Sequence, residues 1–347
     1  MAIDPLEMKN SPVASTGQST SGRGRKTALV TGSVAITALI TSAVIQKARR
    51  ANLSWPDQLP KALDAEVLEM EIMEGPARFY RREGTGVPIV LLHSINAAGS
   101  SFEMRPLFDH FAATTNRPIF ALDWFGFGLS SRPPVQYTPG LYQRQLRRFL
   151  SEHVEAEADI IALSLASEYA ATIASAFPVL VRKLVCISPT GLSDDRNKNP
   201  LLKFAIGAAS GIGAFELMFA RLTNRESIRR FYAQQVFSDG AAVPDELVDY
   251  AVVTTHVRGA HFAPRWFIDG TLFMDEFARR IYSNLQVPTL FIIPEKTRSK
   301  IQQFDRATEV TAVNPSHVSV ESVPTGLLPH WEKPDLVFSA IDRFLEG

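Results

Sequence analysis

One strand–turn–helix pattern near the middle of the chain constrains its fold most. An apolar run from Ile160 to Leu163 leads into Ser164, and Leu165 to Phe177 is rich in alanine and lacks Gly and Pro. The pattern predicts a buried strand and a helix with a serine at the apex of a sharp turn. Ala162 and Ala166 flank the serine at two residues' distance, and a strained turn of this kind admits only small side chains there. Ser164 is therefore a candidate nucleophile; the alternative is an ordinary helix N-cap serine.

Other apolar runs predict further strands before and after this turn. The segment 68–72 alternates apolar residues with Glu and predicts a half-buried strand, with a hairpin partner in 77–82. Shorter, fully apolar runs are typical of buried parallel strands, and they occupy 88–92, 118–122, 184–187 and 288–293, with a last strand at 318–323. A helix is predicted at 142–153 and another at the end of the chain, through Leu345. At 347 residues and 46% hydrophobic content, the chain can form the large core of an α/β protein.

Polar motifs follow three of these strands. The run 88–92 ends in His93-Ser94-Ile95-Asn96, and the run 118–122 ends in a loop from Asp123 to Ser130 that contains two glycines. Pro329-His330-Trp331-Glu332 follows the last strand. Together with the serine turn, and in this order, the motifs resemble the α/β-hydrolase superfamily from about Val67 to the end of the chain.

The resemblance implies an α/β-hydrolase fold: a mostly parallel central sheet flanked by helices, with a helical cap inserted after the sixth strand. It implies that Ser164 is the nucleophile and His330 the general base, while the backbone N–H groups of Ile95 and Leu165 form the oxyanion hole. Asp123 and the glycines of its loop are expected to shape a turn beside the pocket. A serine at the turn argues against the related haloalkane dehalogenases and epoxide hydrolases, which use Asp there.

The third member of the implied triad is missing from its usual place. The family carries Gly-x-x-Asp after the seventh strand, and the matching stretch here, 294–297, puts Thr297 at the acid position. A hydroxyl can accept the histidine N–H, but it cannot stabilise an imidazolium as a carboxylate does. Glu295, two residues earlier, and Asp194 or Asp195 are the remaining candidates.

The chain divides into five segments by composition and pattern. Residues 63–191 and 286–347 are predicted to form the hydrolase core, and 192–285 the cap, with helices at 203–222, 225–237, 244–256 and 266–282. The many aromatic residues of the cap suit an apolar substrate pocket, although a small helical layer also needs a core of its own. Residues 1–26, rich in Ser, Thr, Gly and Pro, are predicted to be a disordered tail, and 47–62 a linker.

Residues 27–46 carry no charged side chain and predict a single membrane-spanning anchor. Twenty helical residues span ~30 Å, the thickness of the hydrocarbon layer. Basic residues flank both ends equally, so charge does not orient the segment. A cleaved signal peptide and an organelle transit peptide are the alternatives.

Two functions follow from these features. The first is a membrane-anchored serine hydrolase, esterase- or lipase-like, that cleaves an ester, thioester or related acyl bond of an apolar small molecule without metal or cofactor. The second is a protein with the hydrolase fold, little or no catalysis, and a binding or scaffolding role. A net charge of zero gives no general attraction to nucleic acid, so no such partner is expected. The single cysteine, Cys186, is predicted to be a buried strand thiol.

Overall fold

The computed structural model describes residues 59–193, 200–211, 213–298, 302–304 and 306–347. All of them belong to one compact unit, residues 54–347. The predicted tail, the membrane anchor at 27–46 and most of the linker lie outside the described residues. Among the described helices, none is by itself long and apolar enough to cross a membrane, and one bent pair, Phe204–Ser210 with Ala214–Leu222, passes the same test jointly.

An eight-stranded sheet in the order β1-β2-β4-β3-β5-β6-β7-β8 forms the centre of the fold. Its strands are β1 (Glu66–Ile72), β2 (Gly75–Arg82), β3 (Ile89–Leu92), β4 (Ile119–Leu122), β5 (Ala158–Leu163), β6 (Val181–Ile187), β7 (Thr289–Pro294) and β8 (Val318–Val323). The β1–β2 and β2–β4 pairs are antiparallel, and every later pair is parallel. This is the α/β-hydrolase fold that the sequence predicts.

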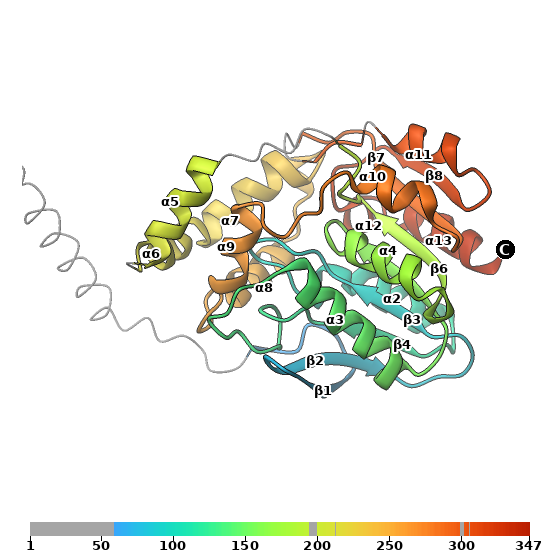
Figure 1. The fold of residues 1–347 in the computed structure, drawn as a ribbon, viewed down its shortest axis with the longest axis horizontal. Helices are drawn as coiled ribbons and strands as arrows, with labels where there is room; N and C mark the ends of the chain where they lie inside the picture. Colours follow the sequence, from blue (N-terminus) through green and yellow to red (C-terminus); the bar gives the residue numbers. More distant parts are fainter. Residues whose placement is uncertain (1–58, 194–199, 212, 299–301, 305) are drawn as a thin grey trace, which may run out of the picture. The chain divides into compact units, whose positions relative to one another are not determined.

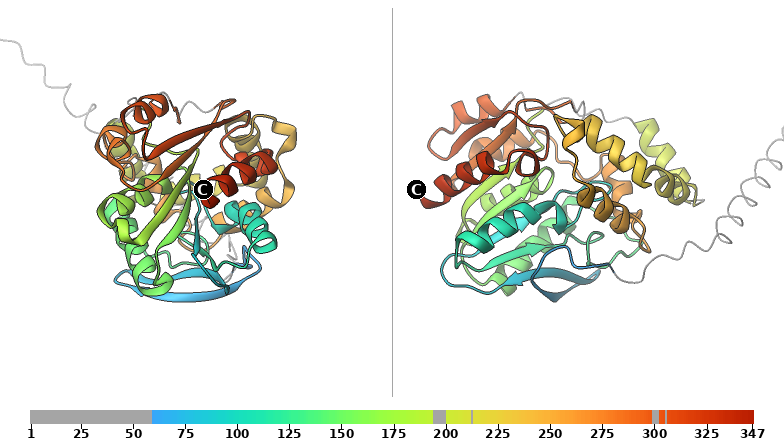
Figure 2. Two further views of the ribbon diagram at one scale, coloured as in Figure 1. Left: turned by 90° about the vertical axis from the view of Figure 1, so that its right-hand side faces the viewer. Right: turned by 180° about the vertical axis from the view of Figure 1, so that it is seen from behind.

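Helices cover both faces of the sheet because the strands are apolar on both sides. Side chains of β3 alternate between two cores: Val90 and Leu92 face α3 (Pro139–Phe149) and α4 (Ala166–Ala176). Ile89 and Leu91 face α2 (Arg105–Thr114) and α13 (Pro334–Glu346). Figure 2 shows these two helical layers on opposite sides of the twisted sheet.

The segment between β6 and β7 is helical, and no strand occurs among its described residues (Figure 1). Its helices are α5 (Pro200–Gly211), α6 (Ala214–Leu222), α7 (Arg225–Phe231), α8 (Asp245–Thr255), α9 (Phe262–Ile268) and α10 (Phe277–Arg280), with short η4 (Tyr232–Val236), η5 (Gly240–Ala242) and η6 (Tyr282–Asn284) between them.

Two of the long cap helices predicted from the sequence are broken at glycine. The prediction of one helix at 203–222 is wrong: α5 and α6 meet at 103°, next to Gly213 with φ 73°. The predicted helix at 266–282 is likewise divided into α9 and α10, with Gly270 at φ 79° just after α9. Glycine enters this left-handed region without the steric penalty of a Cβ atom, so it ends a helix that composition alone would continue.

Candidate active site

Ser164 occupies a strained turn between β5 and α4. Its φ is 56°, in the left-handed region that L-residues other than Gly rarely enter. The conformation is fixed on both sides: the Ser164 N–H donates to the carbonyl of Ile187 at 2.9 Å, and its carbonyl accepts the N–H of Ser167 at 3.1 Å. Ala162 and Ala166 are fully buried beside it. The side chain of Ser164 is half-buried and its hydroxyl makes no hydrogen bond to any described residue.

The register of the sheet brings the two predicted oxyanion donors to adjacent strand ends. β3 pairs with β5 so that Leu92 lies opposite Ala162. Ile95 and Leu165 each lie three residues beyond that pair, on neighbouring strands that run ~4.8 Å apart. Both residues are buried, and neither N–H donates a hydrogen bond within the described part of the chain. Backbone N–H groups without a protein partner at these adjoining strand ends are available to hold an anionic oxygen.

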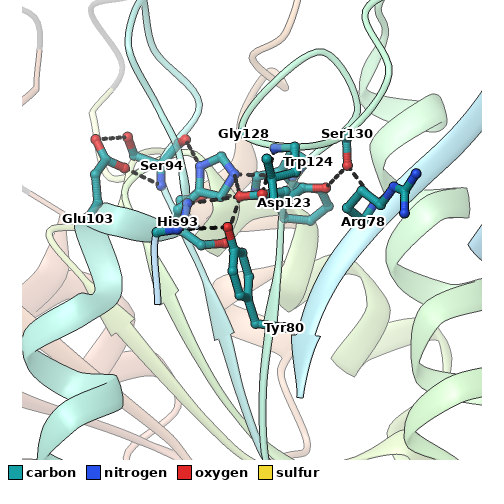
Figure 3. A network of polar contacts seen from close by, with 12 residues as sticks. Arg78, Tyr80, His93, Ser94, Glu103, Asp123, Trp124, Gly128 and Ser130 are labelled. Atoms are coloured by element: carbon teal, nitrogen blue, oxygen red, sulfur yellow. Dashed lines mark hydrogen bonds and ion pairs between the residues drawn. The ribbon is translucent and has the colours of Figure 1, made fainter. Parts of the chain in front are cut away.

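Glu103 connects the turn after β3 to the loop that carries His330. It lies in η1 (Ser101–Met104), and its buried carboxylate accepts the Ser94 N–H at 2.9 Å, the Ser94 hydroxyl at 3.0 Å and the Asn96 Nδ2 at 3.0 Å (Figure 3). Its carbonyl accepts the Nε2–H of His330 at 2.7 Å and the Nε1–H of Trp331 at 2.8 Å. Burial raises the pKa of the Glu103 carboxyl to about 7, while the donated hydrogen bonds lower it.

No motif in the sequence indicates Glu103 as a site residue. Glu103 stands between Phe102 and Met104, and all three side chains are buried in the folded chain. A buried carboxylate needs polar partners, and only folding brings those partners to Glu103.

His330 is held as a neutral imidazole at the start of α12 (Pro329–Glu332). Complete burial lowers its pKa to about 4. Because the Glu103 carbonyl can only accept, Nε2 carries the proton and Nδ1 is the basic nitrogen. Nδ1 is buried without a hydrogen-bond partner. No hydrogen bond joins His330 to Ser164 in the structure.

Glu332, two residues after His330, holds the loop between β8 and α12 in place. One carboxylate oxygen accepts the N–H of Gly326 at 2.8 Å and that of Ser238 at 3.0 Å. Ser238 follows η4, so the carboxylate ties the histidine loop to the segment between β6 and β7. Glu332 is therefore a structural residue of this loop, and its carboxylate is already occupied.

None of the described acidic candidates reaches His330. Glu295 follows the end of β7 and its side chain is exposed, while its backbone N–H pairs with Val323 at 2.8 Å. Thr297 is half-buried in the same segment. The imidazole is bonded to neither of them, since Nε2 donates to Glu103 and Nδ1 has no partner. Asp194 and Asp195 lie outside the described residues.

Asp123 shapes the loop after β4, as the sequence indicates (Figure 3). One carboxylate oxygen accepts the Ser101 hydroxyl at 2.7 Å, and the other accepts the Leu129 N–H at 2.7 Å. A Cβ atom at Gly128 would lie 2.0 Å from the Asp123 Cγ, so the carboxylate fits only because residue 128 is glycine. With both oxygens occupied in buried hydrogen bonds, Asp123 is structural.

His93 is a second buried histidine, and it is structural too. Its Nε2 accepts the N–H of Trp124 at 3.1 Å, which leaves Nδ1–H to donate to the Ser94 carbonyl at 2.7 Å. Burial lowers its pKa to about 4. Both ring nitrogens are thus used to hold the turn after β3 against the loop after β4.

A cavity of about 220 Å³ lies among α5, α6, α9 and the loop 134–136. Phe215, Phe262 and Trp266 line it together with the charged side chains of Glu216 and Arg265. Arg265 stacks on Trp266, with its guanidinium carbon 4.5 Å from the ring centroid. Ser164 is not among the lining residues.

Comparison with known proteins agrees with this architecture. The model of the alpha/beta hydrolase family matches residues 89–340, which is most of the chain. The chain therefore belongs to the alpha/beta hydrolase family.

Among curated proteins, uncharacterized proteins of Mycobacterium tuberculosis and Mycobacterium bovis are 28% identical over 130 residues. That match covers 38% of this chain and 37% of the relatives' length, so the chain spans little more than a third of these proteins.

Solved structures resemble this chain in fold at low identity. A probable hydrolytic enzyme from Pseudomonas aeruginosa gives a TM-score of 0.64 at 18% identity, covering 83% of this chain and 96% of that one. A serine hydrolase involved in carbazole degradation gives 0.62 at 20%, covering 81% and 99%. A membrane phospholipase A gives 0.61 at 15%, covering 93% and 97%.

Proposed function

We propose that this protein is a membrane-anchored serine hydrolase that cleaves an ester, thioester or related acyl bond of an apolar small molecule. The observation that carries the proposal is the strained turn at Ser164, together with the N–H groups of Ile95 and Leu165, which have no partner among the described residues and follow adjoining strands. Two such donors can stabilise the oxyanion of acyl transfer.

The reaction proceeds in two halves. The Ser164 oxygen attacks the acyl carbon while its proton passes to His330, and the carbonyl oxygen becomes an anion held by the Ile95 and Leu165 N–H groups. Collapse of this intermediate releases the alcohol or thiol, which takes the proton from His330. Water then attacks the acyl-serine in the same way and releases the acid.

The Glu103 carbonyl takes over one role of the missing acid, which is to orient His330. By accepting Nε2–H, it fixes the tautomer of His330 and leaves Nδ1 free to take a proton. A neutral carbonyl stabilises the imidazolium less than a carboxylate would. Burial lowers the pKa of His330 to about 4, and the hydrogen bond to the Glu103 carbonyl offsets this only in part. We therefore expect slow turnover; replacing the triad Asp by an amide in a serine protease of unrelated fold costs ~10⁴-fold in rate.

The competing function is a hydrolase fold that binds or scaffolds with little catalysis. The specific observation in its favour is the absence of a hydrogen bond between Ser164 and His330, together with Thr297 at the acid position.

A fluorophosphonate probe separates the two functions. We expect covalent labelling at Ser164, lost in Ser164→Ala and strongly reduced in His330→Ala. Ser151→Ala, at an exposed helical serine, is the matched control and should label as the native protein does. Folded native protein that takes up no probe, or takes it up at another residue, would leave only the binding function.

The acid position gives a second test. Thr297→Asp should raise the hydrolysis of short p-nitrophenyl esters if it supplies the missing carboxylate, and Glu295→Gln should change the rate little because Glu295 is exposed. If Glu295→Gln instead abolishes activity and Thr297→Asp has no effect, Glu295 is the acid in the active arrangement.

Membrane attachment is supported by the sequence of residues 27–46, which combine the length of a bilayer span with the absence of charge. The likeness to a membrane phospholipase A concerns the fold and suggests lipid esters as substrates worth assaying.

A further inference from the structure

The turn after β3 places Ile95 between two residues that both donate to the Glu103 carboxylate. On one side, Ser94 donates its N–H at 2.9 Å and its hydroxyl at 3.0 Å. On the other side, the Asn96 Nδ2 donates at 3.0 Å to the carboxylate oxygen that also accepts the Ser94 hydroxyl. Figure 3 shows the Glu103 carboxylate facing Ser94. The carboxylate therefore closes the turn around the residue whose N–H is the first predicted oxyanion donor.

The direction of the Ile95 N–H depends on the peptide group between Ser94 and Ile95. Its carbonyl accepts the Nδ1–H of His93 at 2.7 Å, and the C=O and N–H of a trans peptide group point in opposite directions. A Cβ atom at Gly99 would lie 2.3 Å from the same carbonyl oxygen, so the turn packs this closely only because residue 99 is glycine. His93 thus holds this peptide group from its carbonyl side, while the bonds to the carboxylate hold the residues before and after it.

Asn96 links the carboxylate to the far end of the turn. Its Oδ1 accepts the Ala98 N–H at 2.6 Å while its Nδ2 donates to Glu103. Asn96 is half-buried, whereas Ser94 and Glu103 are buried. Donated hydrogen bonds compensate a buried carboxylate for the loss of water, and here all three come from the turn. The charge of Glu103 is therefore invested in the conformation of residues 94–98.

The main chain of the same residue is bonded to the proposed base. The Glu103 carbonyl accepts the His330 Nε2–H at 2.7 Å and the Trp331 Nε1–H at 2.8 Å. A shift of residue 103 would therefore displace the turn and the imidazole together. In acyl transfer the oxyanion donors and the base act on one intermediate, so their relative placement decides the rate.

We propose that Glu103 is a positioning residue of the hydrolytic site: its carboxylate orients the Ile95 N–H toward the developing oxyanion, and its carbonyl keeps His330 aligned with that donor. The inference rests on the proposed function, because the donor is used only if Ser164 attacks an acyl group. A fixed donor stabilises the transition state without reorganising as charge develops. Loosening the turn should therefore lower kcat and leave substrate binding almost unchanged.

Two nearly isosteric substitutions and their combination test this proposal. Glu103→Gln replaces one acceptor oxygen by an amide NH₂, which opposes the Asn96 donor. Asn96→Asp keeps an acceptor for the Ala98 N–H but turns a second carboxylate toward Glu103. In the double variant the introduced amide can donate to the introduced carboxylate, which restores the contact with its polarity reversed.

The measurements are kcat and KM for a short p-nitrophenyl ester, and the inhibition constant of an alkyl trifluoromethyl ketone, whose adduct with Ser164 carries an oxyanion. They would be made at about pH 8.5, where the Glu103 carboxyl, with its pKa of about 7, is ionised. Asp159→Asn is the matched control: it removes a buried carboxylate at the opposite end of β5 from Ser164. The melting temperature of each variant reports on folding.

We expect each single variant to lower kcat about 10²-fold, the lower end of the loss caused by deleting an oxyanion donor, and to weaken the ketone similarly. KM should change little, and the double variant should recover most of both losses. Asp159→Asn should lower the melting temperature without weakening the ketone.

The proposal is overturned by folded single variants that bind the ketone as the native protein does, even if they are less stable, because Glu103 is then structural only. A folded double variant that recovers nothing also overturns it. Should Glu103→Gln fail to fold, Asn96→Asp decides alone, since it alters a half-buried side chain of the turn. Native protein that neither reacts with fluorophosphonate nor cleaves esters overturns the proposed function as well, a failure evident before any substitution is made.

Discussion

At the scale of single residues, Ser164 shows a backbone strain at the position of the proposed nucleophile. A left-handed conformation costs a non-Gly residue about 1–3 kcal/mol, and here the pairing of its N–H with Ile187 enforces it. The surrounding sheet and helix maintain the strain. A substitution of Ser164 that relieves the strain should therefore stabilise the protein, although it removes the proposed nucleophile.

Ser164→Gly is therefore expected to be more stable than Ser164→Ala by about 1 kcal/mol, because glycine adopts this φ without a steric penalty. Thermal or denaturant unfolding of the two variants measures the difference. The same pair of substitutions at Ser151, which is helical, should give the opposite order. Equal stability of Ser164→Gly and Ser164→Ala would show that the turn is not strained.

Glu103 makes stability depend on pH in a defined direction. Its carboxyl has a pKa of about 7 when folded, raised from the ordinary 4.5. The folded protein therefore retains a proton that the unfolded chain has released, and this contribution to stability is complete below about pH 4.5 and lost as the pH rises through about 7.

Glu103→Gln removes the titrating group. Its stability relative to the native protein should increase between about pH 4.5 and about pH 7, by on the order of 1 kcal/mol per pH unit within this window. Unfolding curves across this range provide the measurement, with Glu295→Gln, at an exposed carboxyl, as the control. A stability difference that stays constant with pH would mean that Glu103 is ionised throughout.

At the scale of secondary-structure elements, a buried ion cluster joins β5 to the end of α13. The carboxylate of Asp159 is fully buried and pairs with Arg117 and Arg182. Arg182 also donates to the carbonyl of Leu345 at 3.1 Å, near the C-terminus of α13. The cluster thus fixes the strand that carries Ser164 relative to a helix of the opposite layer.

Asp159→Ala should destabilise the protein by about 3–5 kcal/mol, because it leaves two partly buried guanidinium groups without their counter-ion. Glu226→Ala, which breaks the exposed pair with Arg230, serves as the control and should cost no more than about 0.5 kcal/mol. Chemical denaturation distinguishes these magnitudes readily. Similar small losses for both variants would argue against a structural role for the cluster.

At the scale of the whole molecule, the described fold begins after the predicted anchor. Leu59 packs on a cluster that contains Phe215, Val257 and Ala260, and the Ala62 N–H donates to the Tyr80 hydroxyl at 3.0 Å. A truncation that ends before these contacts spares them.

Removal of residues 1–50 is therefore expected to yield a folded protein that carbonate or high-salt washing releases from membranes, whereas the full chain resists both. Fractionation followed by immunoblotting measures this, and circular dichroism confirms folding of the truncated form. Full-length protein recovered in the soluble fraction would indicate a cleaved or loosely bound segment.

The sequence by itself determined the fold and the local geometry of the Ser164 turn. The turn and the parallel strands depend on short-range pattern: apolar runs, small residues and the ends of strands. Cap helices were located but not their breaks, since alanine-rich composition favours helix across Gly213 and only the packing of the two segments decides that the chain bends there.

Only the tertiary structure decided what surrounds His330. Glu103 precedes that histidine by 227 positions, and its role depends on a backbone carbonyl, a group that every residue possesses and that no sequence pattern distinguishes. The exposure of Glu295 and the packing of Leu59 against Phe215, Val257 and their neighbours are likewise consequences of how distant segments come together. Local patterns encode which elements form, whereas the partners of a buried polar group are fixed by long-range packing.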